Sequence, residues 1–539
     1  MVLNLIVTFV PKYKLICNKL PILNFIQKSM KIKITLIVAM ICVCFILANA
    51  SGKKYYASPS GIGEGLNYGD PCALTSGLSK ISNGDSLFLL GGRYDISSSI
   101  TIQKAGTSEA ARTFVGACPG EKPIWDFRNQ THGNNGVTLK NNYIHVKGIT
   151  IRYAGYKGLI NSGSYNLMEN LDVYGNCDTG IQQKGGNNNT ILNCDSHENF
   201  DYITMSGDYC DYGGNADGFA DKQYTNSPGN TYIGCRSWNN SDDGWDFYQR
   251  IGGTTTFKDC LCYNNGPKYY DMSNYARLAT DAYWFDKFKK DTIVTNSNGD
   301  KYTCSISKYY NNGNGNGFKL GGGSTKHDVI LYNCLSIGNR IKGFDQNNNA
   351  GAIQIYNCTS YLNGINYGFT NKSTGYSLVI KNCVSLDSKG SNSFTCNTLT
   401  TSNNTWLSGY SCSASDFLSL DTTLVCNARK EDGSLVATNL LRLKEGSSLI
   451  DKGVIIDGVD YYGTAPDIGC FESNYQSTGI ENIKPTTNII TGRINIYDTA
   501  GRIVGMSSDG KVDTTGLTNG IYIIRSAETN TTISKILKR

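Results

Sequence analysis

Histidine is scarce in this chain. Only 4 of its 539 residues are histidine, and they lie far apart, at positions 132, 145, 197 and 327. No group of cysteine and histidine residues has the spacing of a zinc site. The sequence therefore argues against a transition-metal centre.

Long apolar runs are missing beyond residue 50. A membrane-spanning helix needs about 18 or more apolar residues. The apolar stretch from Ile34 to Leu47 follows two lysines and ends in Ala48-Asn49-Ala50, which is the layout of a secretory signal. We expect residues 1–50 to be a leader, with Met30 as the true start, and the rest to be soluble. A lipoprotein signal is disfavoured because bulky residues precede the leader's cysteines.

An excess of positive charge is also missing once the leader is set aside. The formal net charge of +6 is matched by six lysines and no acidic residue within residues 1–50. The exported part is therefore not basic, and we expect no nucleic-acid partner. Proline is rare, with 10 residues, whereas 60 residues are glycine. This composition favours a β-rich, turn-rich fold over a helical bundle.

A repeat is the most informative feature that is present. Short apolar strands close on an Asn-Cys-like pair, followed by polar residues and then by glycine with an aromatic residue. Several copies are about 25 residues apart, whereas a propeller blade needs roughly 40 or more. Short alternating strands with Asn-Gly turns are typical of a parallel β-helix, so we predict an all-β fold of this kind. The copies include ILNCDSHENF (191–200), YIGCRSWNNSDDGW (232–245), FKDCLCYNNG (257–266), ILYNCLSIGNRIKGF (330–344), IQIYNCTSYLNGINYGF (353–369) and LVIKNCVSLD (378–387).

The cysteines of the repeat are expected to stack. Equivalent positions in successive coils lie about 4.8 Å apart, so these cysteines form one interior column as small apolar residues. Strand geometry often misplaces Cβ atoms for a disulfide, and we favour free thiols, although the sequence does not fix the state of the 16 cysteines beyond the leader. The asparagines beside them are expected to form a ladder of side-chain amides. The predicted column is Cys235, Cys260, Cys304, Cys334, Cys358 and Cys383.

The repeat also sets the domain boundaries. We expect a β-helix domain at residues 51–474, a linker at 475–485 and a separate C-terminal domain at 486–539. Within the first, residues 51–130 form an N-terminal cap with a short amphipathic helix, and residues 427–474 close the other end. The last segment alternates apolar and polar residues, which is typical of a small antiparallel sheet.

Four aspartates fall in one register. Asp217 and Asp243 each precede a glycine and an aromatic residue at equivalent positions of successive coils, and Asp242 and Asp246 flank the second copy. Aspartate is common in turns, but the coincidence of four is not explained that way. Four carboxylates within two coils of about 4.8 Å would repel one another. An exposed oxygen cluster of this type favours Ca²⁺ over Mg²⁺ or Zn²⁺.

Lys319 follows the same landmark further along the chain. It lies two residues after Gly317, as Asp246 does after Gly244, so we place it in the column of Asp246. With one coil between them, Lys319 is two coils from Asp246, roughly 10 Å along the axis. A nearby Ca²⁺ and partial burial both favour the neutral amine, which makes Lys319 the candidate general base. The alternative is an ordinary surface lysine.

A family resemblance rests on these same blocks. NADGFADK, SWNNSDDGWDFY and GNGNGFKLGG resemble the signature blocks of polysaccharide lyase family 9, pectate and related lyases on a right-handed parallel β-helix, over roughly residues 54–474. The resemblance implies that Ca²⁺ is held by Asp217, Asp242, Asp243 and Asp246, with Lys319 as the Brønsted base. It also implies β-elimination on an acidic plant cell-wall polysaccharide, in which Lys319 removes the C5 proton of a uronate and the C4 oxygen leaves. Homogalacturonan and rhamnogalacturonan, and endo and exo cleavage, stay open.

The end of the chain carries a second resemblance. The segments RINIYDTAGRIVG, LTNGIYIIR and KILKR are similar to the C-terminal sorting domains of type IX secretion substrates. This implies recognition by an outer-membrane secretion machinery and a secreted or cell-surface protein; whether the domain is removed stays open. A carbohydrate-binding or spacer domain is the alternative, although an aromatic sugar platform is missing.

Two other functions compete with the lyase. A polygalacturonase-like hydrolase shares the expected fold, and Arg340-Ile341-Lys342 is similar to its substrate-binding triplet, but its Asn-Thr-Asp and Gly-His-Gly blocks are absent. A non-catalytic, calcium-stabilised polysaccharide-binding solenoid would give Lys319 no role. Arg250 is a weak candidate for substrate binding, and the irregular insertion at 266–301 has no assigned role beyond walling the groove. We expect a monomer.

Overall fold

The computed structural model describes residues 52–201, 213–271, 292–295, 299–305, 307–370, 375–475, 494–498, 503–507, 520–527 and 532–538. The expected leader, its start at Met30, and nearly all of the expected linker lie outside the described residues. The chain divides into two compact units, Met1–Ser477 and Thr478–Arg539. None of the described helices is long and apolar enough to cross a membrane.

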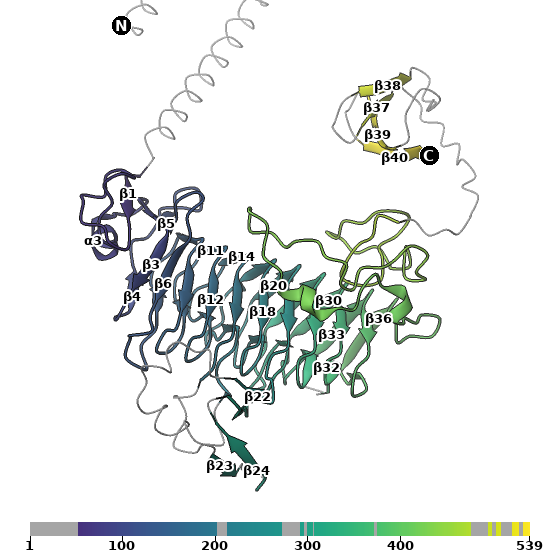
Figure 1. Cartoon of the computed structure of the whole chain (residues 1–539). Helices are drawn as coiled ribbons and strands as arrows, with labels where there is room; N and C mark the ends of the chain where they lie inside the picture. The colour runs from purple at the N-terminus through teal and green to yellow at the C-terminus, as the bar shows by residue number, and fades with distance from the viewer. Residues whose placement is uncertain are drawn as a thin grey trace, which may run out of the picture. The chain divides into compact units, whose positions relative to one another are not determined.

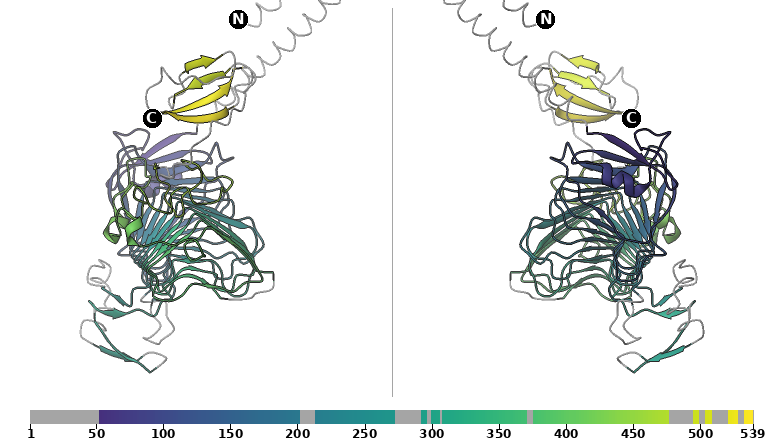
Figure 2. Two further views of the ribbon diagram at one scale, coloured as in Figure 1. Left: turned by 90° about the vertical axis from the view of Figure 1, so that its right-hand side faces the viewer. Right: turned by 90° about the vertical axis from the view of Figure 1, so that its left-hand side faces the viewer.

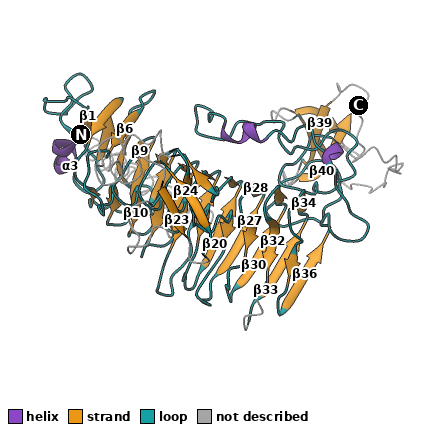
Figure 3. Cartoon of the chain, turned by 60° about the horizontal axis from the view of Figure 1, so that its bottom comes forward, coloured by secondary structure: helices purple, strands orange, loops and turns teal. Residues whose placement is uncertain are grey.

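The described part of the larger unit is wound from three parallel sheets, which we name A, B and C. Strands that neighbour each other within a sheet come from successive coils, so the chain forms a parallel β-helix, as the repeat predicts (Figure 1). Figure 3 shows the strands of successive coils aligned in rows. The short helix expected in the N-terminal segment is present as α3 (Leu74–Lys80), which lies between β1 and β2 in the chain.

The strand bounds show how regular the coils are. Sheet A contains β1 (Lys54–Ala57), β2 (Ser86–Leu89), β5 (Thr113–Ala117), β8 (Ile144–Lys147), β11 (Leu167–Glu169), β14 (Thr190–Leu192), β17 (Thr231–Ile233), β20 (Thr254–Lys258), β27 (Asp328–Tyr332), β30 (Ala352–Tyr356), β33 (Ser377–Lys381) and β36 (Thr398–Ser402). Sheet B contains β3 (Gly92–Asp95), β6 (Pro123–Asp126), β9 (Thr150–Arg152), β12 (Asp172–Tyr174), β15 (Asp195–His197), β18 (Arg236–Trp238), β21 (Leu261–Tyr263), β28 (Leu335–Ile337), β31 (Thr359–Tyr361) and β34 (Val384–Leu386). Sheet C contains β4 (Ile100–Ile102), β7 (Val137–Leu139), β10 (Leu159–Asn161), β13 (Ile181–Gln183), β16 (Phe219–Asp221), β19 (Trp245–Asp246), β26 (Phe318–Lys319), β29 (Lys342–Asp345), β32 (Ile365–Phe369) and β35 (Ser393–Phe394).

Side chains alternate along each strand, so every second residue points into the coil. On sheet C the inward residues form a continuous aromatic stack with ring centroids 4.7–5.1 Å apart. All of these rings are fully buried, and such stacks add to the stabilisation from apolar burial. The stack runs Phe219, Trp245, Phe318, Phe344 and Tyr367.

Buried cysteines form the predicted interior column, with one correction. Cys194 belongs to it and Cys304 does not, because Cys304 ends β24 (Lys301–Cys304) in the insertion, where it pairs antiparallel with β23 (Thr292–Thr295). All the described cysteines are free thiols. The observed column is Cys194, Cys235, Cys260, Cys334, Cys358 and Cys383, each at most 1% exposed.

An asparagine ladder is present, but its members are not the asparagines that precede the cysteines. Those residues, such as Asn333 and Asn357, have φ values of 53° and 50° and make the left-handed turn between sheets A and B, a conformation that asparagine tolerates. The ladder lies instead at the corner between sheets B and C, where each side-chain amide donates to the amide oxygen of the next coil over 2.8–3.0 Å. Its members are Asn176, Asn199, Asn240, Asn265, Asn339 and Asn363.

The segment after the last coil lies along sheet B rather than only across the end. It carries the short 3-10 helices η3 (Ala414–Asp416) and η4 (Thr422–Cys426) (Figure 3). Phe417, Val425 and Leu443 form a second apolar core with Leu335 and Val384, which project outward from sheet B. The outward positions of these strands are apolar, and burying each such side chain contributes about 1.5–3 kcal/mol.

His197 lies on the outer face of sheet B. Its ring stacks between Tyr174 and Trp238, with centroids 4.9 and 4.0 Å away, and its Nε2 lies 3.0 Å from Asp172 Oδ1. Burial disfavours the charged ring, but Asp172 and Glu198 outweigh this and raise the pKa of His197 to about 9. The unfolded chain has a histidine pKa of about 6.5, so the charged ring stabilises the fold fully below that pH, and the stabilisation is lost as pH rises through about 9.

We predict that His197 gives the fold a measurable pH dependence. Between about pH 6.5 and 9, the free energy of unfolding should fall by about 2 kcal/mol more in the wild type than in His197→Gln. Denaturant unfolding at a series of pH values measures both curves. Parallel curves for the two proteins would contradict the prediction.

The smaller unit is an antiparallel sheet. Its described strands are β37 (Ile494–Tyr497), β38 (Ile503–Ser507), β39 (Gly520–Ser526) and β40 (Thr532–Lys538), in the order β38-β37-β39-β40. The alternating pattern of the C-terminal segment thus corresponds to a small β-domain, as predicted.

Candidate active site

The candidate site lies at the corner where sheet B turns into sheet C. Asp217, Asp243 and Asn316 occupy equivalent positions in successive coils, each followed by glycine and a buried aromatic residue. A Cβ atom on Gly244 would meet the carbonyl oxygen of Gly317, and one on Gly218 would meet Ser237 Oγ. The landmark glycine is therefore required by the close approach of successive coils, and the aromatic stack fixes the backbone beneath the acidic residues.

Three of the predicted metal ligands converge. Asp217, Asp242 and Asp243 offer carboxylate oxygens that all lie within 4.8 Å of one another. The backbone N–H of Asn316 donates to Asp243 Oδ1 over 2.7 Å, and the N–H of Asn314 donates to Asp242. These aspartates are at most 2% exposed, so the expectation of an exposed cluster was wrong. The segment that carries Asn314 and Asn316 packs against Asp242 and Asp243 through these hydrogen bonds.

Lys319 is closer to the aspartates than the sequence suggested. Strand β26 pairs directly with β19, and Lys319 is the register partner of Asp246. Its Nζ lies 2.8 Å from Asp243 Oδ2 and 3.2 Å from Asp246 Oδ1. The prediction of an intervening coil was wrong, because the strand around Cys260 and Lys319 belong to the same coil, separated by the long insertion.

Lys222 is a part of the site to which the sequence pattern assigned no role. Its Nζ lies 2.7 Å from Asp246 Oδ2 and 3.2 Å from Asp217 Oδ2. Asp246 therefore lies between two lysines and outside the group of three convergent carboxylates. The position of Lys222 directly after β16, the strand that follows Asp217, was the signal that could have identified it.

The charges of the site are strongly coupled. Burial, together with Asp246 and Asp243, raises the pKa of Asp217 to about 7, against the opposing effect of Lys222 and Lys319. Burial and then Asp243 raise the pKa of Asp242 well above its usual value. Burial would lower the pKa of Lys319, but the carboxylates of Asp243 and its neighbours hold it well above the ordinary value. The carboxylates alone thus oppose the expected neutral amine.

The donor set fits a hard cation. The three convergent groups are all carboxylates, and in the described part of the chain no other cluster of three or more acidic, histidine or cysteine side chains brings its ligand atoms this close together. Oxygen-only donors are those that Ca²⁺ binds in proteins. Burial is the main cause that raises the pKa values of Asp217 and Asp242, and a divalent cation held between these carboxylates would favour their charged forms.

Arg250 lies elsewhere. It is 0% exposed, its Nε lies 3.3 Å from Asp221 Oδ1, and its Nη2 donates to the carbonyl oxygen of Pro228. Its guanidinium is thus used inside the fold, which argues against the expected substrate contact. Tyr248 is better placed than Arg250 to contact a substrate. Tyr248 is 43% exposed, and its ring centroid lies 6.0 Å from Lys319 Nζ.

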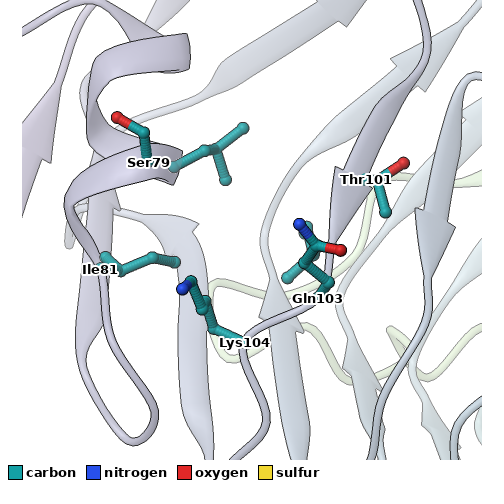
Figure 4. A pocket seen from close by; sticks show the side chains of 7 residues that line it. Ser79, Ile81, Thr101, Gln103 and Lys104 are labelled. Atoms are coloured by element: carbon teal, nitrogen blue, oxygen red, sulfur yellow. The ribbon is translucent and has the colours of Figure 1, made fainter.

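A separate cavity of about 270 Å³ is lined in part by α3 (Figure 4). Its lining includes Ser79, Thr101 and Gln103, and Lys104 is the one charged residue among them. These residues belong to the first coils, whereas the acidic cluster lies several coils further along. We therefore take the carboxylate–lysine corner, and not this cavity, as the candidate active site.

Comparison with known proteins identifies the family of the chain. The family described as Pel9A-like, right handed beta helix region, matches residues 55–278 and 280–404. The chain is 33% identical over 458 residues to pectate lyase L of Dickeya dadantii (strain 3937), which covers 82% of this chain and 95% of that protein. It is 31% identical over 431 residues to pectate lyase L of Paenibacillus polymyxa (strain SC2), which covers 75% of this chain and 84% of that protein.

Solved structures show the same fold. The crystal structure of pectate lyase Pel9A superposes with a TM-score of 0.65 at 33% identity and covers 78% of this chain and 96% of that one. A rhamnogalacturonan lyase, with a TM-score of 0.55 and 23% identity over 73% of this chain and 97% of that one, shares the fold. At the other end, a secretion system C-terminal sorting domain matches residues 477–539. The chain therefore belongs to the Pel9A-like right-handed β-helix family, and it is a secreted polysaccharide lyase.

Proposed function

We propose that this lyase cleaves pectate, a polymer of galacturonate, by calcium-dependent β-elimination. The observation that carries the proposal is the contact between a buried lysine and a convergent carboxylate cluster, with Lys319 Nζ 2.8 Å from Asp243 Oδ2. Asp217, Asp242, Asp243 and Asp246 are the proposed calcium ligands, and Lys319 is the proposed base. Similarity to two pectate lyases above 30% identity supports pectate as the substrate.

The residues of the site divide the chemistry between them. Lys319 accepts the proton from C5 of the uronate, and the electrons of that C–H bond form the C4–C5 double bond. The C4–O bond to the neighbouring sugar breaks, and the leaving oxygen keeps that electron pair and takes up a proton from solvent. Asp243 and Asp246 fix the position of the Lys319 side chain, and the backbone donors of Asn314 and Asn316 hold Asp242 and Asp243 in place. Such preorganised positioning lowers the barrier without any rearrangement during the reaction.

Bound Ca²⁺ would supply positive charge both to the buried carboxylates and to the uronate carboxylate, where negative charge develops in the transition state. Asp217, Asp242 and Asp243 would hold it directly. Asp246 contacts Lys222 and Lys319 in this structure and would join the set only by exchanging one of these contacts for the ion. Positive charge held by the carboxylates would weaken the field that keeps Lys319 protonated.

The same geometry disfavours the two other candidates. A non-catalytic solenoid has no use for a buried lysine held against the carboxylates of Asp243 and Asp246, because burying such charges is costly. A hydrolase needs one carboxyl group as an acid and a second, separate one to activate water or attack the sugar. Here the carboxylates converge on one another, and two lysines balance their charge.

Analysis of the reaction products tests the proposal. Incubation with polygalacturonate should give oligomers that absorb in the ultraviolet, because each cleavage creates a C4–C5 double bond conjugated to the carboxylate. Rhamnogalacturonan should give little or no such product. New reducing ends without ultraviolet absorbance would indicate hydrolysis and would overturn the proposal, and cleavage of rhamnogalacturonan alone would overturn the substrate assignment.

A further inference from the structure

The insertion between sheets B and C is attached directly to the catalytic corner. In the following coil, sheet B ends at Ile337 and sheet C resumes at Lys342, whereas in the coil of Lys319 the connection runs from Tyr263 to Phe318. Its returning end supplies the backbone donors to Asp242 and Asp243. Figures 1 and 2 show that its strands, including β23 and β24, stand out from the side of the β-helix.

A short ribbon anchors the insertion. Strand β22 (Tyr269–Tyr270) pairs antiparallel with β25 (Tyr309–Tyr310). Tyr270 and Tyr309 are 6% and 0% exposed, and their rings lie 4.8 and 5.6 Å from that of Phe200, centroid to centroid. Because side chains alternate along a strand, Tyr269 and Tyr310 project from the opposite face of the ribbon.

That opposite face carries aromatic rings and ammonium groups together. The rings of Tyr302 and Tyr310 are stacked with centroids 3.8 Å apart, and Tyr269 lies 6.1 Å from Tyr310. Lys268 Nζ lies 5.8 Å from the ring centroids of both Tyr269 and Tyr302, and Lys308 Nζ lies 5.0 Å from that of Tyr269. Both lysines are exposed, and Tyr269 is 37% exposed. We call these five residues the tyrosine–lysine cluster.

The cluster is suited to an acidic sugar chain. Aromatic rings offer apolar faces for the C–H groups of a pyranose ring, and exposed ammonium groups attract carboxylates. Among the described residues of the insertion, the exposed acidic side chains are Asp271 and Asp300, and Asp300 Oδ2 accepts a hydrogen bond from the Tyr302 hydroxyl over 3.4 Å. Lys301 adds a third exposed ammonium group to the two lysines of the cluster. Anchoring of the ribbon does not account for the exposure of Tyr269 and the two lysines, because Tyr270 and Tyr309 on its buried face already pack on Phe200.

The cluster is also close to the point of cleavage. Tyr310 is followed by Asn311, whose Nδ2 donates over 2.7 Å to the carbonyl oxygen of Ser241, the residue before Asp242. With consecutive Cα atoms about 3.8 Å apart, Tyr310 and Asp242 are within roughly 15 Å. A bound polymer that reaches Lys319 can thus also reach the insertion.

We propose that the tyrosine–lysine cluster is a binding subsite for uronate residues of the substrate chain that lie away from the bond being cleaved. The inference rests on the proposed function for its substrate class. Binding energy gained there favours long polymers over short oligomers, because only a long chain spans both the catalytic corner and the insertion. The subsite itself requires no metal.

Calorimetric titration of the full chain with a long and a short oligogalacturonate tests this proposal. The titrations are run with a chelator present, so that the oligomers are not cleaved and the heat measured reports binding alone. The wild type should bind the long oligomer more tightly than the short one. Replacing both lysines (Lys268→Ala with Lys308→Ala), or Tyr269→Ala alone, should weaken binding of the long oligomer by about three- to tenfold and leave the short one unchanged.

Matched controls separate this effect from a general loss of charge or fold. Lys444→Ala with Lys452→Ala removes the same charge from exposed positions in the C-terminal cap and should leave both affinities unchanged. Tyr269→Phe retains the ring and should bind as the wild type does. Wild-type affinity for the long oligomer in the variant lacking both lysines, or equal binding of long and short oligomers by the wild type, would overturn the proposal.

Discussion

Lys319→Ala is expected to reduce kcat on polygalacturonate by about 10²- to 10⁴-fold, the range that a positioned general base contributes. The variant removes the only proposed proton acceptor at C5 but none of the calcium ligands. It also removes an ammonium 2.8 Å from Asp243 Oδ2, so calcium should bind at least as tightly as in the wild type. Initial rates of ultraviolet absorbance, with a calcium titration of the same protein, measure both effects.

Two other substitutions make this prediction specific. Lys452→Ala changes an exposed lysine of the C-terminal cap and should leave kcat unchanged. Lys222→Ala removes the other lysine of the corner, which contacts Asp217 and Asp246. If turnover survives in Lys319→Ala and is lost in Lys222→Ala, then Lys222 is the base and the assignment of Lys319 is wrong.

Asp243→Asn is expected to weaken calcium binding by about 100-fold or more, since even residues that only support a metal ligand typically matter by 10–100-fold. The amide keeps the shape of the side chain. In the wild type the N–H of Asn316 donates to Asp243 Oδ1, and the amide oxygen of the variant can accept the same hydrogen bond. In the wild type, calcium at 100 times its Kd should stabilise the fold by about 2.7 kcal/mol. Thermal unfolding with and without calcium should show this increase in the wild type and little of it in Asp243→Asn.

A matched control is available at the surface. Asp457→Asn changes an exposed aspartate in the C-terminal cap and should keep the full calcium-dependent stabilisation. The prediction for Asp243 fails if Asp243→Asn is stabilised by calcium as strongly as the wild type, at the same calcium concentrations.

The fold was predictable because the repeat is periodic at the level of single residues. The alternation of apolar residues and the glycine–aromatic landmark placed Asp217 and Asp243 in equivalent positions of successive coils, and the structure pairs β16 with β19 as that register requires. The landmark also placed Lys319 in register with Asp246, which the pairing of β19 with β26 bears out.

The errors in the predicted coil arrangement arise from the long insertion within one coil. The strand around Cys260 was counted as a separate coil, because nothing local shows that the long segment after it returns to the same coil before Phe318. The same segment contains Cys304, which ends a short apolar–polar strand as the cysteines of the repeat do in sequence, but that strand, β24, pairs antiparallel with β23. Periodicity identifies equivalent positions, but it does not count the coils across an insertion.

The sequence repeat also did not predict the contacts between segments that are far apart in the chain. The asparagines beside the cysteines and those of the ladder lie in similar polar sequence contexts. Only the structure distinguishes Asn333, which makes a left-handed turn, from Asn240, whose side chain belongs to the ladder. Burial of the aspartates depends on the returning insertion near Asn314. The pairing of Lys222 with Asp246 joins two successive coils and needs side-chain positions to be seen.

We propose that the carboxylate cluster and Lys319 form a calcium-dependent elimination site. The most direct test of this claim is the initial rate of ultraviolet absorbance on polygalacturonate for protein stripped with a chelator, before and after calcium is restored. We predict no detectable unsaturated product from the stripped protein and full, saturable recovery with Ca²⁺. Undiminished formation of unsaturated product by the stripped protein, with chelator in excess, would contradict the claim.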